Sequence, residues 1–270
     1  MPTRDEGWPN GTPCWVDVTV DDMAAASTFY SALFGWDTQE GPPETGGYTM
    51  CLLNGRPAAA ISPKQGGDTT PSAWSTYLAV DDLDATVAKA KQAGSQFMME
   101  TMDVMTLGRM TFGTDPAGAG YGIWQARDFG GVGVYNEPGA LIWNELMTRD
   151  YEGAKAFYGS VFGYEYDEMG DDTNFQYSTI KRSDGEVVAG LGAMGADMPP
   201  EMTPQWTTYF NVADTDATVA KALELGATIS SNPTDTPFGR MAVIQGPEGE
   251  HFSIMQDPPR DDGAQASAEA

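Results

Sequence analysis

Two acidic residues, Asp17 and Glu145, stand at matching places in two segments of alternating polarity, WVDVTV and WNELMT. In an extended strand alternate side chains share one face, so each acid is expected beside the tryptophan two residues earlier, Trp15 or Trp143. A carboxyl on a half-buried face is costly unless it is partnered, and such a group can act as a general acid or base. The single histidine of the chain, His251, is a third candidate for proton transfer.

Each of these candidates also has a structural explanation. The two acids could pair with Arg109 or Arg240, which stand in two copies of a GRM motif. Those arginines could instead bind an acidic ligand, and His251 could be a surface residue beside a turn. The two tryptophans could fill space without contacting any ligand.

The two acidic segments belong to two copies of one sequence. FYSALFGW at residues 29–36 returns as FYGSVFGY at residues 157–164, which is 128 residues later. The longer stretch WSTYLAVDDLDATVAKAKQAG at residues 74–94 returns as WTTYFNVADTDATVAKALELG at residues 206–226. A repeat of about 130 residues has the size of a domain and therefore indicates a tandem duplication.

The repeat defines the expected domain boundaries. We expect one module at residues 8–128 and a second at residues 137–257, joined by the glycine-rich stretch RDFGGVGVYNEPGA. The end of the chain, residues 258–270, lacks apolar content and is predicted to be a disordered tail.

Each copy has the pattern of a strand, a helix and several strands, twice over. The segment WVDVTV alternates with period two, which predicts a strand. Asp22 then stands where a helix N-cap is expected, apolar residues follow at helical spacing, and Gly35 comes just after the predicted end. The repeated octet is therefore the core face and the end of a helix. The chain is predicted to be an α+β protein with four βαβββ units.

A βαβββ unit with D…A…FY…LFGW in its first helix and VDDxDA before its second resembles the vicinal oxygen chelate superfamily, which includes glyoxalases, bleomycin-resistance proteins and extradiol dioxygenases. The openings GTPCWVDVTVDD and LIWNELMTRD resemble those of two-module, glyoxalase-like actinobacterial proteins described as hydroxylases or glyoxalases. The resemblance implies an open, eight-stranded half-barrel in each module, with a ligand cleft on its concave side. In metal-using members, three side chains in the cleft hold a divalent metal that grips two neighbouring substrate oxygens.

The ligand positions that the resemblance implies carry no usual metal ligand. In the first, fifth and last strands of the two modules, these positions fall on Trp15, Trp143, Ser75, Thr207, Gly122 and Ser253. We therefore expect no metal at the family's positions and no cofactor. The alternative is a divalent metal, Mg²⁺ or Mn²⁺, held by relocated oxygen ligands such as Asp17.

Strand parity predicts what lines the clefts instead. An indole floor, one acid, a phenol and hydroxyl or glycine gaps suit a flat, partly apolar molecule with one or two hydrogen-bonding oxygens. The expected ligand-binding residues are Trp15, Ser75, Tyr77, Trp124, Trp143, Thr207, Tyr209, Ser253 and Met255.

This lining leaves three functional hypotheses open. The first is a protein that binds a small planar or aromatic metabolite without a metal. The second is an enzyme, of the glyoxalase, hydroxylase or dioxygenase type, that uses Asp17, Glu145 or His251 as a general acid or base, or a relocated metal. The third is that one module is degenerate, in which case the second cleft is the functional one because it is more polar.

The composition bounds the location and the partners of the chain. Fourteen basic and 39 acidic residues give a formal charge of −25, which disfavours nucleic acid and anionic membranes as partners. Two cysteines fit a reducing cytoplasm, and no apolar run has the length of a signal peptide core or a membrane span. We expect a cytoplasmic monomer or weak homodimer that binds a small molecule.

Overall fold

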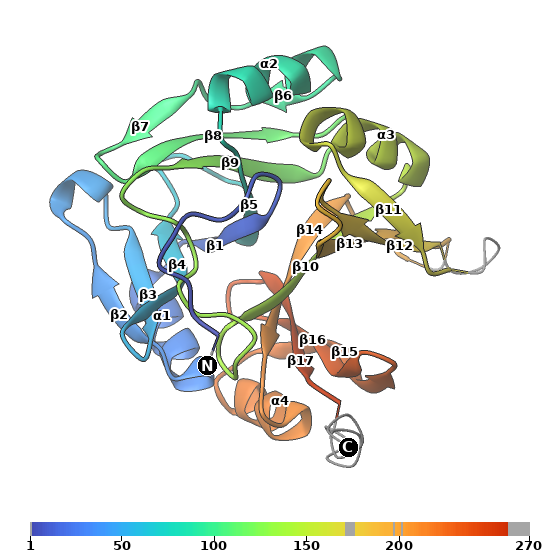
Figure 1. The fold of residues 1–270 in the computed structure, drawn as a ribbon. Coiled ribbons are helices and arrows are strands. Elements are labelled where there is room, and N and C mark those ends of the chain that lie inside the picture. The colour runs from blue at the N-terminus through green and yellow to red at the C-terminus, as the bar shows by residue number, and fades with distance from the viewer. Residues whose placement is uncertain (1, 171–175, 197, 201, 259–270) are drawn as a thin grey trace, which may run out of the picture.

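The chain forms two open β-sheets, one from each half of the sequence (Figure 1). The computed structural model describes residues 2–170, 176–196, 198–200 and 202–258. Of the predicted tail only the exposed Pro258 is among these residues, so the predicted disorder lies outside them. No helix in the described part of the chain is long and apolar enough to cross a membrane.

The first sheet comes from module 1, the half of the chain that ends at Ala126. Its elements are β1 (Pro13–Val20), α1 (Met23–Phe34), β2 (Asp37–Glu40), the 3₁₀ turn η1 (Pro43–Thr45), β3 (Thr49–Leu53), β4 (Arg56–Pro63), β5 (Ala73–Ala79), α2 (Leu83–Gln92), β6 (Gln96–Phe97), β7 (Met102–Val104), β8 (Gly108–Thr114) and β9 (Gly120–Ala126). The strand order is β2-β3-β4-β1-β5-β9-β8-β6, with β7 paired to β8. Two units thus join through the antiparallel pair of β1 and β5.

The second sheet, from module 2, repeats this plan. Its elements are β10 (Leu141–Thr148), α3 (Tyr151–Phe162), β11 (Glu165–Glu168), β12 (Tyr177–Lys181), β13 (Val187–Ala193), β14 (Gln205–Asn211), α4 (Thr215–Glu224), β15 (Thr228–Thr236), β16 (Gly239–Gln245) and β17 (His251–Gln256). The order β11-β12-β13-β10-β14-β17-β16-β15 matches the first sheet strand for strand. The predicted α+β fold, with an open sheet of two units in each module, is confirmed.

Local sequence explains the helix ends. The Asp22 carboxylate accepts hydrogen bonds from the backbone N–H groups of Ala24 and Ala25, which have no partner inside the helix. Gly35 ends the same helix in the left-handed region, at φ 74°, where glycine lacks the clash of a Cβ. Asp150 and Gly163 repeat this arrangement around α3.

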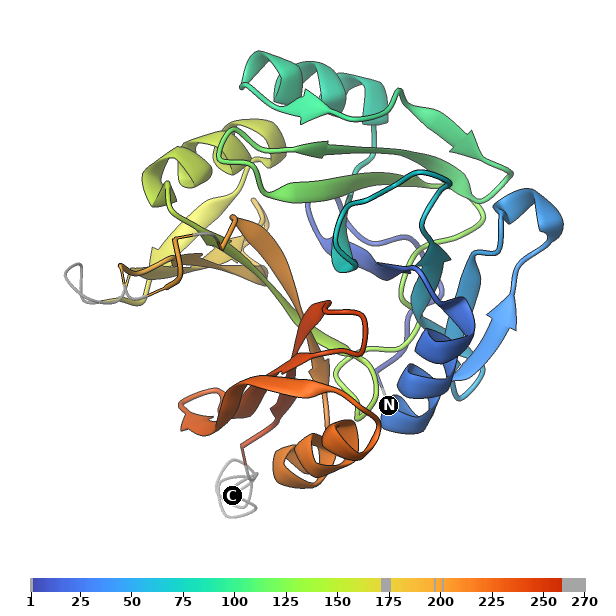
Figure 2. The same ribbon diagram turned by 180° about the vertical axis from the view of Figure 1, so that it is seen from behind.

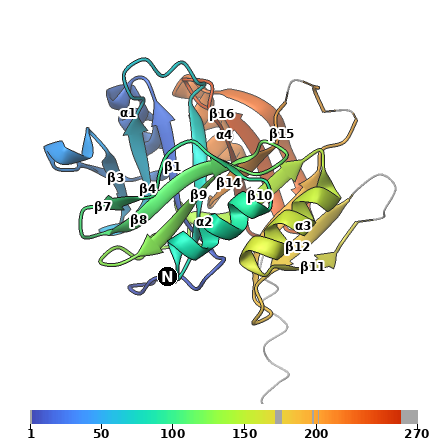
Figure 3. The same cartoon turned by 90° about the horizontal axis from the view of Figure 1, so that it is seen from above.

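The helices pair across the two modules rather than within one. Helix α1 of module 1 packs beside α4 of module 2, and α2 packs beside α3 (Figure 2 and Figure 3). The strands β5 and β14 also contact each other. The chain is therefore one body in which each half covers part of the other.

The repeated octet supplies polar contacts across this boundary. In module 1, Tyr30 donates its hydroxyl hydrogen to Glu250 of module 2 at 2.7 Å and accepts a hydrogen bond from the indole of Trp74 at 3.1 Å. In module 2, Tyr158 donates to Asp115 of module 1 at 3.2 Å and accepts from Trp206 at 2.9 Å. All six side chains are buried.

That last residue bonds to the backbone before the opposite module's first strand. The indole of Trp36 donates to the carbonyl of Gly139 at 2.6 Å, and the hydroxyl of Tyr164 donates to the carbonyl of Gly11 at 2.5 Å. Gly11 and Gly139 are 128 residues apart, as are the two octets. The octet recurs because each copy makes the same contacts with the other half of the chain.

Candidate functional site

The first-strand acid of module 1 lies at the centre of a hydrogen-bonded group, the Asp17 cluster, made of Trp15, Asp17, Tyr48 and Tyr77. The hydroxyls of Tyr48 and Tyr77 both donate to Oδ2 of Asp17, each at 3.0 Å. The indole of Trp15 donates to the Tyr48 hydroxyl at 2.7 Å. Parity explains the grouping, since Trp15 lies opposite Tyr77 in the pairing of β1 with β5.

The Asp17 carboxyl is almost removed from water, with an exposed fraction of 3%. Burial raises its pKa to about 6, and the two tyrosine hydrogen bonds oppose that rise only in part. Its second oxygen, Oδ1, has no hydrogen-bond partner among the described residues. The cluster therefore contains one acceptor that nothing satisfies.

The linker between the modules closes the Asp17 cluster with an aromatic ring. Phe129 lies edge-on to Trp15, with ring centroids 4.9 Å apart, and 6.0 Å from the centroid of Trp124. The indole of Trp124 donates to the backbone carbonyl of Phe129 at 3.0 Å. Trp15 and Trp124 are consequently only 5% and 7% exposed.

Close packing fills the remaining space beside Tyr77. Its register partner is Gly122, and a Cβ built on Gly122 would meet the Tyr77 ring at 2.1 Å. The corresponding partner of Tyr209 in module 2 is Ser253, which carries a side chain there. The Tyr77 ring thus occupies the space next to Gly122 that the side chain of Ser253 takes at the equivalent position of module 2.

The acid of module 2 forms the matching Glu145 cluster, made of Trp143, Glu145, Tyr177 and Tyr209. The Tyr209 hydroxyl donates to Oε1 of Glu145 at 3.1 Å, and Tyr177 is also hydrogen-bonded to this carboxyl. The indole of Trp143 donates to the Tyr177 hydroxyl at 3.4 Å. The two clusters therefore share one design, an acid that accepts from two phenols beside an indole.

The Glu145 cluster is more open than its counterpart. Trp143, Glu145 and Tyr177 are each partly exposed, although the Glu145 carboxyl is enclosed enough that burial raises its pKa. Tyr177 and Tyr209 oppose that rise by donating hydrogen bonds to the charged form. A carboxyl with a raised pKa in a partly exposed side chain can bind a ligand hydroxyl or exchange a proton with it.

A pocket of about 310 Å³ adjoins Trp143 at the start of β10. Its wall includes Ile142, Val187 and Val188 of module 2, together with Trp8 and Tyr135 from the segments before the first strands. A pocket of this size fits a small molecule.

In module 1 the linker occupies the position that corresponds to this pocket. There, Val132 donates its backbone N–H to Cys14 at 2.8 Å, and Gly133 donates to Pro57 at 2.7 Å. By sequence repeat and strand register, the counterparts of Cys14 and Pro57 are Ile142 and Val187, which both line the pocket. The linker thus pairs with the backbone of module 1, and its Val132 also lines the pocket beside module 2.

Of the other predicted site residues, three lie on strands near the acids and His251 lies at the surface. Ser75 stands opposite Asp17 and Thr207 opposite Glu145 in the strand pairing, while Met255 follows Ser253 on the same face of β17. His251 is exposed at the start of β17 and takes no part in the hydrogen bonds of the Glu145 cluster.

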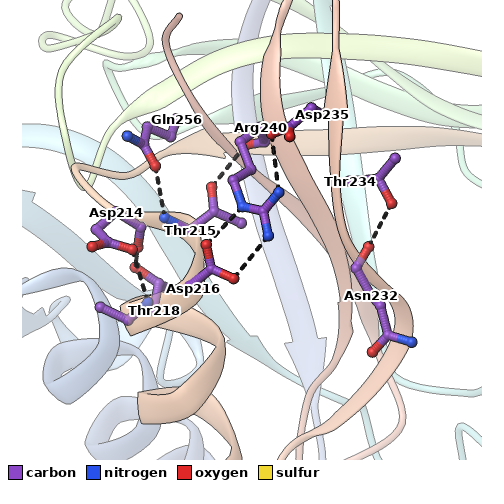
Figure 4. Close-up of polar contacts among 10 residues, drawn as sticks. Asp214, Thr215, Asp216, Thr218, Asn232, Thr234, Asp235, Arg240 and Gln256 are labelled. Atoms are coloured by element: carbon purple, nitrogen blue, oxygen red, sulfur yellow. Dashed lines mark hydrogen bonds and ion pairs between the residues drawn. The ribbon is translucent and has the colours of Figure 1, made fainter. Parts of the chain in front are cut away.

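The two arginines considered as partners of the acids bind elsewhere. Arg109 makes two hydrogen bonds to Asp84, at 2.8 and 3.1 Å, in the first turn of α2. Figure 4 shows Arg240 bonded to Asp216 in the first turn of α4 and to Asp235 on β15. Pairing of the acids with these arginines was a wrong alternative, because each GRM strand runs past the start of a helix with its own acid.

Two residues of these clusters, Tyr48 and Tyr177, and the neighbouring Phe129 were not predicted from the sequence. Tyr48 and Tyr177 come from the hairpins next to the first strands. Tyr48 directly precedes β3 in GYTM, and Tyr177 begins β12 in QYST. Their matching position in the repeat is a signal that could have revealed them. Phe129 lies in the linker, where no repeat partner among the described residues points to it.

The residues at the family's metal positions do not fit a divalent metal. Within the described residues there is no group of three or more His, Cys, Asp or Glu side chains that could hold an ion. Each cluster offers one carboxyl, whose neighbours are hydrogen-bond donors rather than ligands. No step of chemistry is therefore derived through a metal.

Comparison with known proteins agrees with this architecture. The sequence model of the Glyoxalase/Bleomycin resistance protein/Dioxygenase superfamily matches residues 14–121 and 140–254. The chain belongs to this superfamily. The two matched stretches of this glyoxalase-superfamily protein contain both acid clusters, while Phe129 lies between them.

Two curated relatives align with nearly the whole of this chain. "Putative glyoxylase CFP32" of Mycobacterium tuberculosis is 43% identical over 265 residues, which cover 96% of this chain and 100% of that protein. "Anthracycline biosynthesis protein DnrV" of Streptomyces peucetius is 36% identical over 265 residues, covering 91% of this chain and 93% of that protein.

Solved structures share the fold at low identity. The Mn(II)-bound glyoxalase from Novosphingobium aromaticivorans superposes with a TM-score of 0.63 and 15% identity, covering 92% of this chain and 83% of that one. At this identity the likeness shows the fold alone.

Proposed function

We propose that the second module binds a flat aromatic molecule bearing hydroxyl or carbonyl oxygens, at the Glu145 cluster and without a metal. One observation supports this proposal above all others. The Glu145 carboxyl accepts hydrogen bonds from two phenols and belongs to a partly exposed side chain, and no ion pair to it is seen within the described residues.

The chemistry of this carboxyl defines what it would take. A carboxylate has about four acceptor sites on its two oxygens, and Tyr177 and Tyr209 do not use them all. A ligand hydroxyl that donates to the remaining capacity would make a charge-assisted hydrogen bond. The indole of Trp143 beside it suits an aromatic ring, which gains both apolar burial and a favourable edge or face contact.

The names of the relatives narrow the class of ligand to be tried. One relative is named an anthracycline biosynthesis protein, and anthracyclines contain fused aromatic rings with phenol and quinone oxygens. We therefore take 2,6-dihydroxyanthraquinone as the probe, because it is flat and its hydroxyls lie away from the quinone oxygens, where they can donate to Glu145.

Matched substitutions in the two modules test the proposal. Titration of the probe, followed by the quenching of tryptophan fluorescence, should show binding to the wild-type chain. Glu145→Gln should weaken it by roughly 10- to 100-fold, the equivalent of one hydrogen bond to a charged group. The control Asp17→Asn makes the same change in module 1 and should alter the affinity by less than about twofold.

The same pair of modules supplies a second control. Trp143→Ala should weaken the probe, whereas Trp15→Phe should not. Affinity should also survive dialysis against a chelator. Equal effects of Glu145→Gln and Asp17→Asn, or loss of binding after chelation, would count against a metal-free site in module 2.

A second candidate function is acid–base catalysis at the same carboxyl. The raised pKa of Glu145 favours it, because a general acid or base works best when its pKa approaches the working pH. One relative is named a glyoxylase, so the hemithioacetal of methylglyoxal and a thiol is the substrate to test. Turnover that survives a chelator and is lost in Glu145→Gln would establish this function, and its absence would leave binding alone.

A further inference from the structure

We propose that module 1 contains a second aromatic-binding site, of the phenol class, which the protein's own linker holds closed with the ring of Phe129. This inference does not depend on what module 2 binds. It rests on the contacts of Phe129, on the path of the linker and on the unsatisfied oxygen of Asp17.

The Phe129 ring is positioned as a bound aromatic ligand would be. It lies edge-on to Trp15 at an angle of 87° and is also edge-on to Trp124 at 76°, both geometries that aromatic pairs favour. The residue is only partly buried, so its ring covers the site rather than forming part of the deep core. The two indoles form an aromatic recess, and a side chain from outside both matched stretches fills it.

Few backbone contacts hold this ring in place. The N–H of Phe129 donates to the carbonyl of Leu107 at 3.0 Å, and its carbonyl accepts from Trp124. The next two residues are Gly130 and Gly131, and Gly131 has φ 110°, a conformation open to glycine. A Cβ on Gly131 would lie 2.2 Å from the carbonyl oxygen of Cys14, so the turn after Phe129 requires glycine.

The carboxyl beside the recess indicates what the site would take when open. Asp17 lies two residues after Trp15, on the same face of β1, and its Oδ1 is buried without a partner. Phe129 carries no donor that could satisfy it. A phenol offers both the ring that the indoles contact and a hydroxyl that can donate to Asp17.

Module 2 provides an internal comparison. The residues equivalent to those that the linker pairs with, Ile142 and Val187, line an open pocket there instead. The linker residue Val132 also lines that pocket, and Met255 stands in module 2 where Trp124 stands in module 1.

The experiment measures phenol and toluene binding to Phe129→Ala by calorimetry. Phe129→Ala should bind one more equivalent of phenol per chain than the wild type does. At this additional site the affinity for phenol should be at least tenfold higher than the affinity for toluene. Adding Asp17→Asn should remove the preference for phenol, while adding Trp143→Ala should leave the extra equivalent in place. The control Phe97→Ala removes another partly buried ring of module 1, on β6, and should gain no phenol site.

A second variant guards against loss of folding. Phe129→Leu keeps an apolar side chain over the recess and should show the same phenol preference with weaker binding. The proposal is overturned if both variants fold and bind phenol no better than Phe97→Ala, or if phenol and toluene bind equally. If the anthraquinone probe does not bind module 2, Phe129→Ala should still bind its additional equivalent of phenol. The two proposals can therefore be rejected independently.

Discussion

Asp17 and Glu145 hold the same register position in two matching sheets, yet Asp17 is sealed from water while Glu145 remains partly exposed. Each acid accepts hydrogen bonds from two tyrosines and has an indole two residues before it. In the first cluster the linker also places the ring of Phe129 against Trp15. One duplicated design has therefore given a buried acid in module 1 and a partly exposed one in module 2.

The sealed carboxyl makes stability depend on pH. Its pKa rises from 3.8 to about 6 in the folded chain, so between these values the folded state binds more protons than the unfolded state. Unfolding free energy should therefore fall as the pH rises through this window, by up to about 3 kcal/mol from this group. Urea denaturation of the wild type and of Asp17→Asn at pH 4 and pH 7 measures this change in unfolding free energy.

The difference between the two proteins is the informative quantity. Asp17→Asn should gain stability relative to the wild type as the pH rises, because the amide cannot ionise. A difference that stays constant across this window would contradict the assigned burial cost.

The paired tyrosines of the octet should stabilise the joint between the modules. Tyr30→Phe leaves the Glu250 carboxyl and the Trp74 indole without their buried partner, which should cost about 1–3 kcal/mol of unfolding free energy. Tyr158→Phe should cost a similar amount through Asp115 and Trp206. Denaturant unfolding of each single variant provides the measurement.

Tyr135→Phe is the control for both substitutions. Tyr135 is partly exposed, and no hydrogen bond of its hydroxyl is seen within the described residues. Losses for the octet variants no larger than the loss for this control would show that the boundary contacts contribute little.

Much of this arrangement could be predicted from the sequence. Period-two alternation places Trp15 and Asp17 on one face, and the octet's spacing identifies the end of a helix. The sequence could not reveal that Tyr30 bonds to Glu250, 220 positions away, because helix periodicity indicates a buried face without saying what covers it. The role of Phe129 was hidden for a similar reason, since a linker has no periodic pattern.

Gly190 should be needed for the geometry of the Glu145 cluster. A Cβ at this position would lie 2.1 Å from the Tyr177 hydroxyl and 3.0 Å from Nε1 of Trp143. Gly190→Ala should therefore displace Tyr177 and weaken the dihydroxyanthraquinone probe by roughly tenfold, the value of about one hydrogen bond. Fluorescence titration measures the change, and circular dichroism checks that the fold remains.

Module 1 shows that the fold itself accepts this substitution. The residue opposite Asp17 is Ala60, at the position that Gly190 takes opposite Glu145. Unchanged probe affinity in Gly190→Ala would argue against a role for Tyr177 in binding.

The GRM arginines should matter little for the ligand. Arg240 is bound to Asp216 and Asp235, both well exposed, and surface ion pairs of this kind contribute about 0–1 kcal/mol to stability. Arg240→Gln should reduce the unfolding free energy by no more than that and leave probe affinity within about twofold. A much larger loss of affinity would restore the arginine as part of an acidic-ligand site.

A crystal structure of the chain soaked with 2,6-dihydroxyanthraquinone tests the central claim most directly. Density for one flat ligand is expected against Trp143 in module 2, with an oxygen within hydrogen-bond distance of the Glu145 carboxyl and Phe129 still in place over module 1. A ligand bound in module 1 alone, or a cation gripped by protein groups at the centre of either sheet, would contradict the account.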